Sequence, residues 1–163
     1  SERHRFEGED IREDMMSGTE KRRKLNTERM HEKLKGDEFP EDTEEFLEED
    51  IYDYFDILLK AKGMKKSAVI RRANLSRVYG YQLMEGRRRG KRDYYLLIAL
   101  ALGLNLTETQ RMLSVVRCGA LHPLIKRDAA VIFAVNHGYD VFDTYEFMCS
   151  LGLDPLHDGT EAE

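Results

Sequence analysis

The chain has no tryptophan, only three prolines and only two cysteines among its 163 residues. Cys118 and Cys149 lie far apart in the sequence, and neither belongs to a Cys-x-x-Cys pair. This spacing excludes a disulfide-rich scaffold and gives no support for a zinc site. We expect both cysteines to be reduced thiols packed in a helical core.

Long apolar runs are also missing. No stretch approaches the roughly 18 consecutive apolar residues that a transmembrane helix needs. The first thirty residues are densely charged, which is unlike a secretory signal peptide. The sequence therefore predicts a soluble, cytoplasmic protein with no membrane partner.

Motifs that carry chemistry are scarce. No glycine-rich phosphate-binding loop follows a strand pattern, and no nucleophile with a neighbouring base can be argued from the sequence. We therefore expect no enzymatic activity, no metal and no cofactor. None of the five histidines has the spacing of a metal-ligand set; they are His4, His31, His122, His137 and His157.

Acidic residues are nearly absent from one segment. Between Lys60 and Arg92, twelve Lys or Arg residues accompany a single acid, Glu85, which gives this segment a net charge of +11 in a chain whose net charge is -5. A binding footprint depends on local clustering of charge and not on the total. The segment is therefore a candidate surface for a polyanion.

The first part of the chain, residues 1–42, is acidic and has no sustained helical periodicity, so it is predicted to be a mostly disordered tail. A short helix from about Thr19 to Leu34 is compatible with its sequence. The basic run 21–24 lies between acids, so we interpret it as a solvated charge cluster, with a phosphate-binding arm as the alternative. A second disordered tail is predicted at 157–163.

From about Glu44 onward, apolar residues recur three and four positions apart, which is typical of the buried faces of helices. No alternating strand pair is found, so the predicted fold class is all-α. The predicted helices are one ending near Lys62 and Gly63, two short ones joined at Asn74 with the second closed by Gly86, one from Tyr94 to Leu102 stopped by Gly103, one opened by a capping box at Thr107–Gln110, one from Lys126 to His137, and one capped by Asp140.

Three motifs lie in register along these helices. Leu75-Ser76-Arg77 opens the third helix, Glu85-Gly86-Arg87-Arg88 follows it, and Ile-Ala-Leu-Ala-Leu-Gly-Leu occupies 98–104. In this order they resemble the phage-repressor-like helix-turn-helix family, of the xenobiotic-response-element type, over about Ile51 to Thr109. The resemblance implies a helix-turn-helix domain at 43–106, extended by a packed C-terminal helical segment at 107–156.

The sequence departs from this family at the junction of the two short helices. The family usually has Ala in the middle of the second helix and Ile or Val in the middle of the third, whereas this chain has Ile70 and Gly80. Both positions are predicted to face the junction, so the exchange would conserve volume. Val78 is expected on the apolar face of the third helix, with Leu75, Tyr79 and Leu83.

The resemblance implies that the third helix lies in the major groove of double-stranded DNA and that the protein is a sequence-specific transcription regulator. Arg77 can pair with guanine, Gln82 with adenine, and Val78 can contact a thymine methyl. The candidate base-reading residues are Ser76, Arg77, Val78, Tyr81 and Gln82, and the candidate phosphate contacts are Lys66, Arg87, Arg88, Arg89, Lys91 and Arg92.

Other interpretations remain open. The helix-turn-helix could serve as a protein-interaction or adaptor module, and the tyrosines could be packing residues. Regulators of this class read two-fold sites as dimers, so we expect a homodimer. A protein partner could bind the acidic tail, or the tail could fold back and compete with DNA. The aromatic residues of the C-terminal helices fill the core or form a partner surface; they are Phe133, Tyr139, Phe142, Tyr145 and Phe147, with Met148.

Overall fold

The computed structural model describes residues 27–41 and 50–157, and the chain divides into two compact units, Ser1–Glu48 and Glu49–Glu163. Every regular element in the described residues is a helix, so the predicted all-α class is confirmed. In the first unit a helix spans 27–34, within the predicted helix, whose earlier residues lie outside the described range. The predicted disorder of 1–26 and 158–163 also lies outside it.

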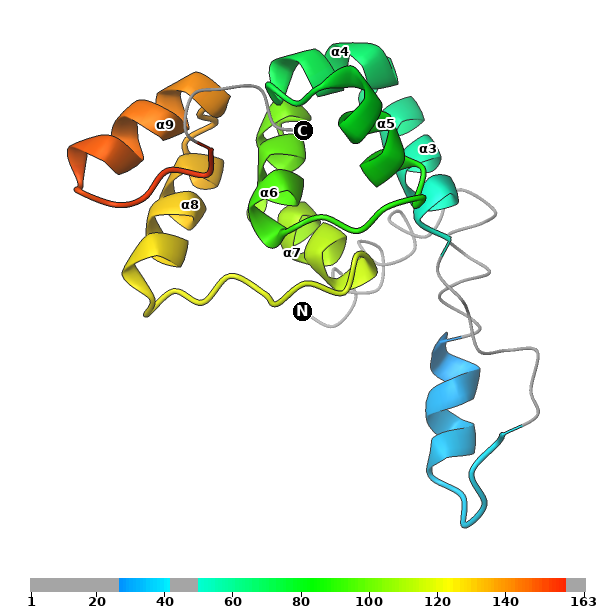
Figure 1. Cartoon of the computed structure of the whole chain (residues 1–163). Helices are drawn as coiled ribbons and strands as arrows, with labels where there is room; N and C mark the ends of the chain where they lie inside the picture. Colours follow the sequence, from blue (N-terminus) through cyan, green and yellow to red (C-terminus); the bar gives the residue numbers. More distant parts are fainter. Residues whose placement is uncertain (1–26, 42–49, 158–163) are drawn as a thin grey trace, which may run out of the picture. The chain divides into compact units, whose positions relative to one another are not determined.

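The second unit is a bundle of helices in which α6 is central (Figure 1). The helices α8 and α9 pack on each other as a C-terminal hairpin, and α9 also contacts α6. None of the helices in the described ranges is long and apolar enough to span a bilayer. The elements are α3 (Ile51–Lys62), α4 (Lys66–Arg72), α5 (Arg77–Met84), α6 (Arg92–Ala101), α7 (Leu106–Val115), α8 (Lys126–Asn136) and α9 (Val141–Ser150).

The helix ends follow the sequence signals closely. Asp50 caps α3 by accepting a hydrogen bond from the Tyr52 backbone N–H at 2.9 Å, and Gly63 ends this helix with φ of 64°. Asn74, with φ of 56°, makes the turn between α4 and α5, as the sequence predicted. The residues before Asp50 that were predicted to begin the first helix lie outside the described range.

The start of α7 corrects one prediction. The capping box is formed by Asn105 and Glu108, and not by Thr107 and Gln110: the Asn105 side chain accepts from the Glu108 N–H at 2.8 Å, and the Glu108 carboxylate accepts from the Asn105 N–H at 3.1 Å. The observed and the predicted pair each consist of a capping residue and an acid or amide three positions later, so both fit the capping-box pattern. The earlier start also lets the buried Thr109 hydroxyl donate to the Asn105 carbonyl, at 2.8 Å.

The core is built around α6, whose residues Tyr95 to Ala101 are all buried, as is the following residue, Leu102. A helix that is apolar on every face is typical of a central position in a bundle. Cys118 is partly buried, and burial raises the pKa of its thiol. Cys149 is exposed on α9, so the expectation that both thiols lie in the core is wrong for Cys149.

Gly80 of α5 packs closely against Ile70 of α4. A Cβ atom on Gly80 would lie 2.6 Å from Cγ2 and 2.7 Å from Cγ1 of Ile70, which is itself buried. The prediction that both positions face the junction is therefore confirmed, and the exchange of volume between them stays a prediction.

The predicted burial of Val78 is wrong. Its side chain is 69% exposed, whereas Leu75, Tyr79 and Leu83 are buried. The three buried residues lie four apart on one helical face, and Val78 is rotated about 100° away from Tyr79. Val78 therefore belongs to the outer face of α5.

Candidate nucleic-acid interface

The outer face of α5 carries four of the five residues predicted to read bases. Arg77 and Val78 are exposed, and Tyr81 and Gln82, one turn later, are partly exposed. Residues one and four positions apart form a continuous strip along a helix. The fifth residue, Ser76, caps α5: its Oγ accepts a hydrogen bond from the Tyr79 N–H at 3.2 Å.

Two cations flank Tyr81 on this surface. The Lys66 ammonium, at the start of α4, lies 5.9 Å from the centre of the Tyr81 ring and 4.9 Å from that of Tyr52. The Arg77 guanidinium lies 5.8 Å from the Tyr81 ring. These cation–π contacts orient both cations without neutralising their charge. The first residue of α4 and the first turn of α5 therefore contribute to one surface.

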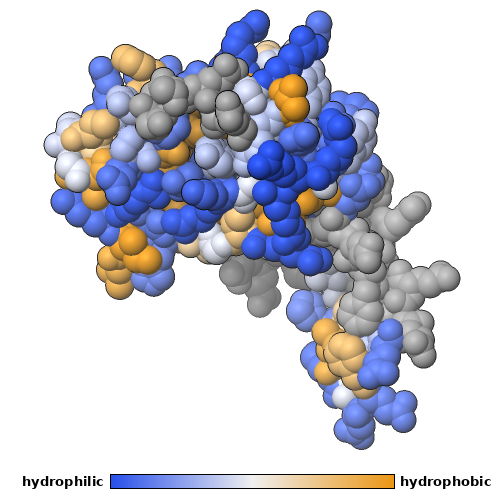
Figure 2. Space-filling model, in the orientation of Figure 1, coloured by the Kyte–Doolittle hydropathy of each residue, from blue (hydrophilic) through white to orange (hydrophobic). Residues whose placement is uncertain are grey.

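The basic loop, residues 86–91, continues this surface beyond α5. Its start is fixed because the backbone N–H groups of Arg87 and Arg88 both donate to the Gln82 carbonyl, at 2.9 and 3.2 Å. The Arg88 guanidinium lies 5.0 Å from the centre of the Tyr79 ring. Figure 2 shows strongly hydrophilic side chains gathered over this loop. Its exposed cations are Arg87, Arg88, Arg89 and Lys91.

The end of the basic loop is held equally closely. The Gly90 N–H donates to the Tyr95 hydroxyl at 3.3 Å. A Cβ atom on Gly90 would lie 2.7 Å from the Tyr79 hydroxyl and 2.8 Å from Cδ2 of Leu83, so a larger residue would push the loop away from α5. Burial raises the pKa of both tyrosine hydroxyls, which keeps them neutral. The loop is therefore anchored at both ends.

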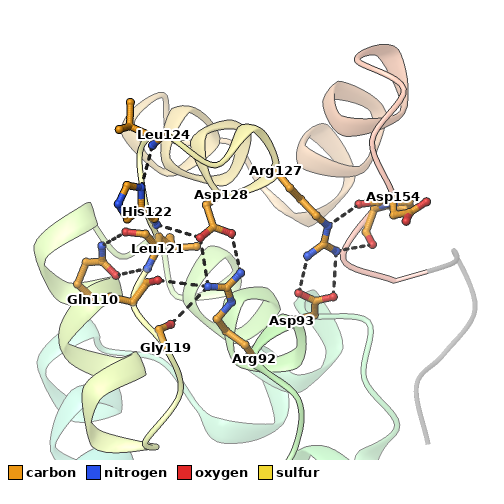
Figure 3. A network of polar contacts seen from close by, with 12 residues as sticks. Arg92, Asp93, Gln110, Gly119, Leu121, His122, Leu124, Arg127, Asp128 and Asp154 are labelled. Carbon is orange, nitrogen blue, oxygen red and sulfur yellow. Dashed lines mark hydrogen bonds and ion pairs between the residues drawn. The ribbon is translucent and has the colours of Figure 1, made fainter.

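Arg92, the last predicted phosphate contact, is engaged inside the protein (Figure 3). Its guanidinium pairs with Asp128 of α8 at 2.6 Å and also donates to the carbonyls of Gly119 and Ala120, at 3.5 and 3.3 Å. A phosphate contact would require these bonds to break. We therefore leave Arg92 out of the interface and regard it as a structural residue.

A second ion pair between α6 and α8 lies beside the first (Figure 3). Asp93 accepts two hydrogen bonds from Arg127, both at 2.9 Å, so adjacent residues of α6 pair with adjacent residues of α8. Arg127 also donates to the carbonyls of Asp154 and Pro155, both at 3.0 Å, which ties the segment after α9 to the same point.

Asp128 is the buried centre of this network. Burial alone would raise the pKa of its carboxyl group, but hydrogen bonds from the His122 N–H and from Arg92 outweigh that effect and lower the pKa. The sequence analysis missed this site because its partners lie 34 to 36 residues apart. The only signal in the sequence was an Arg followed directly by an Asp in each of the two helices, Arg92-Asp93 and Arg127-Asp128.

One acid lies within the basic surface. The Glu85 carboxylate, at the end of α5, forms an ion pair with Arg87, in which Oε2 lies 3.2 Å from Nε, and its other oxygen lies 4.0 Å from Nζ of Lys66. Two residues predicted to contact phosphates thus share one carboxylate. The surface as a whole remains strongly cationic.

In the described part of the chain, no group of three or more His, Cys, Asp or Glu side chains is arranged to hold a metal ion. Comparison of the chain with protein-family models, with curated proteins and with solved structures finds no match in any of the three. A function for the interface therefore has to be argued from its own geometry and charge.

Proposed function

We propose that the protein binds double-stranded DNA in a sequence-specific manner, with α5 in the major groove and the basic loop on the phosphates, as a helix-turn-helix transcription regulator. One observation supports this most. The outer strip of α5 presents Arg77, Val78, Tyr81 and Gln82 directly beside the four exposed cations of an anchored loop. Base-reading and phosphate-binding groups are thus adjacent.

The strip has the chemistry that base recognition needs. Arg77 can donate two hydrogen bonds to guanine, and Gln82 can form a bidentate pair with adenine. Val78 is an apolar side chain that is 69% exposed on a short helix, which suits contact with a thymine methyl. Each well-formed bidentate pair contributes about 1 to 3 kcal/mol of discrimination between bases.

The phosphate contacts are assigned to Arg87, Arg88, Arg89 and Lys91, with Lys66 at the edge. Cations that neutralise phosphates release counterions, so binding weakens as salt rises, with a slope of about 0.9 per contact in a plot of log affinity against log salt. These residues would set affinity and position, and α5 would set the sequence.

A DNA selection with the purified full-length chain tests the proposal. The wild-type protein should return one sequence motif, and Arg77→Ala and Gln82→Ala should each relax one position of it. Lys126→Ala, which removes an exposed cation at the start of α8, serves as the charge-matched control and should leave the motif intact. A selection that returns no motif would overturn sequence-specific binding.

A second candidate is use of the fold as a protein-interaction module. It is favoured by exposed apolar side chains around the C-terminal hairpin: Leu124 is 89% and Phe142 is 65% exposed. Phe133, also partly exposed, stacks on Phe147 with ring centres 5.0 Å apart, whereas Met148 is buried. An adaptor would return no DNA motif, or only random sequence bound in a salt-sensitive way.

The proposal includes a homodimer, because two copies of α5 could read the two halves of a two-fold site. Sedimentation at micromolar concentration should give twice the mass of one chain, and a single-chain mass would contradict this.

The acidic segment 1–42 is a candidate partner for the basic surface or for another protein. If it competes with DNA, its deletion should raise affinity for random DNA at low salt.

A further inference from the structure

Glu85 is the single acid between Lys60 and Arg92, and its carboxylate lies beside two cations of the proposed DNA-binding surface, Lys66 and Arg87. It is the C-cap residue of α5, one turn after Gln82. Its side chain is only 25% exposed, so the carboxylate is partly shielded from water between α4 and the basic loop. A shielded charge interacts more strongly with its neighbours than a fully exposed one.

The two oxygens of Glu85 face two different cations. Oε2 lies 3.2 Å from Nε of Arg87, and Oε1 lies 4.0 Å from Nζ of Lys66. Lys66 is also held between two tyrosine rings, whereas the Arg87 side chain is 60% exposed and can turn toward a ligand. A DNA phosphate that approaches either cation must therefore compete with a carboxylate already in place.

We propose that Glu85 is an internal counterion that weakens the contacts of Lys66 and Arg87 with DNA phosphates and so limits binding to random sequence. This inference rests on the proposed function. The carboxylate makes no hydrogen bond or ion pair with Arg77 or Gln82, so it lowers the sequence-independent part of the affinity and leaves base reading intact. Phosphates are contacted in DNA of any sequence, so the carboxylate lowers the affinity for random DNA and for a specific site alike, and the ratio of the two affinities stays with the base-reading residues.

Salt dependence provides a signature of this role. A cation that stays on its carboxylate neutralises no phosphate, so it displaces none of the counterions condensed on the DNA. Wild-type binding should therefore depend on salt less steeply than the number of cations on the surface implies. Once the carboxylate is neutralised, Lys66 and Arg87 should contribute to the salt dependence as the other cations do.

The test compares Glu85→Gln with the wild type in the full-length chain, using a short DNA duplex of random sequence. Glu85→Gln should bind this duplex about fivefold more tightly, since two partly shielded ion pairs are released. The slope of log affinity against log salt, measured from about 50 to 200 mM, should steepen by about two, since each of the two cations contributes about 0.9. Glu146→Gln, which removes an exposed acid from α9, is the charge-matched control and should change affinity less than twofold.

A double-mutant cycle with Arg87→Ala locates the effect. If Glu85 acts through Arg87, then Glu85→Gln should tighten binding much less when Arg87 is already absent. The melting temperature of each variant is measured in parallel, because a merely structural Glu85 would lower the melting temperature and weaken DNA binding when replaced.

The outcomes separate the inference from the proposed function. No binding of any duplex by the wild type would overturn DNA binding, and this inference with it. Binding by the wild type that Glu85→Gln weakens, or raises no more than Glu146→Gln does, would overturn the role of Glu85 and leave DNA binding standing. Tighter and more salt-sensitive binding by Glu85→Gln alone would support both.

Discussion

Two helix pairs in this protein are held together by different physics. The pair α4 and α5 meets through an apolar fit, in which Ile70 fills the space left by Gly80. The helices α6 and α8 are joined by two ion pairs, Arg92 with Asp128 and Asp93 with Arg127. The first contact fixes the helix proposed to enter DNA, and the second fixes the C-terminal hairpin at the end of the basic loop.

Neighbouring cations of the basic segment have different structural roles. The cations at 87–91 remain at the surface, where a polyanion could reach them, whereas Arg92, the next cation in the chain, is used inside the protein. Sequence alone groups these residues together. What separates them is Asp128, which approaches Arg92 from a helix 36 residues later.

The largest expected effect is in the charged pair. Asp128→Ala should destabilise the protein by about 4 kcal/mol, because it leaves the Arg92 guanidinium partly buried and without its carboxylate. Urea denaturation of this variant and of the wild type measures the difference. A loss of less than about 1 kcal/mol in the free energy of unfolding would mean that the ion pair of Arg92 with Asp128 contributes little to holding α8.

The apolar pair should respond to added volume. Gly80→Ile should destabilise the protein by about 3 kcal/mol, because its side chain would overlap that of Ile70. The double variant Ile70→Ala with Gly80→Ile should recover most of the wild-type melting temperature in a thermal denaturation experiment. Failure of this rescue would show that the two positions do not exchange volume.

A smaller effect is expected from the more exposed half of the charged pair. Asp93→Asn should cost about 1 kcal/mol, since the Asp93 and Arg127 side chains both keep access to water. Chemical denaturation at low and high salt should show the cost shrinking as salt rises. An effect as large as that of Asp128→Ala would contradict the distinction between the two ion pairs.

The two helix pairs should also differ in their response to acid. The folded-state pKa of Asp128 lies below its ordinary value, so its stabilisation is fully present above that ordinary value and is lost as the pH falls through the folded-state pKa. Melting temperatures measured from about pH 5 down to pH 2 should fall less in Asp128→Asn than in the wild type. Equal falls would assign the acid sensitivity to other groups.

Local signals made much of the fold predictable. Gly63, Asn74 and Asp140 mark helix ends because each end is decided by a few neighbouring residues. Asn105 and Thr107 both have a capping-box partner three residues later, so spacing alone could not predict which of them begins α7.

The site was predictable only in part. The strip on α5 follows from helical geometry, apart from the orientation of Val78, which depends on where the helix begins. The pairing of Arg92 with Asp128, and of Lys66 with Glu85, depends on long-range packing that no local pattern encodes. Charge counts therefore located the surface but could not say which cations are free.

The most direct measurement of the central claim is an NMR titration of the full-length chain with duplex DNA, following every backbone amide. The account predicts that the largest chemical-shift changes fall on residues 76–91, in α5 and the basic loop, and that the α8–α9 hairpin changes little. Changes concentrated on 121–151, or no changes at low salt, would contradict it.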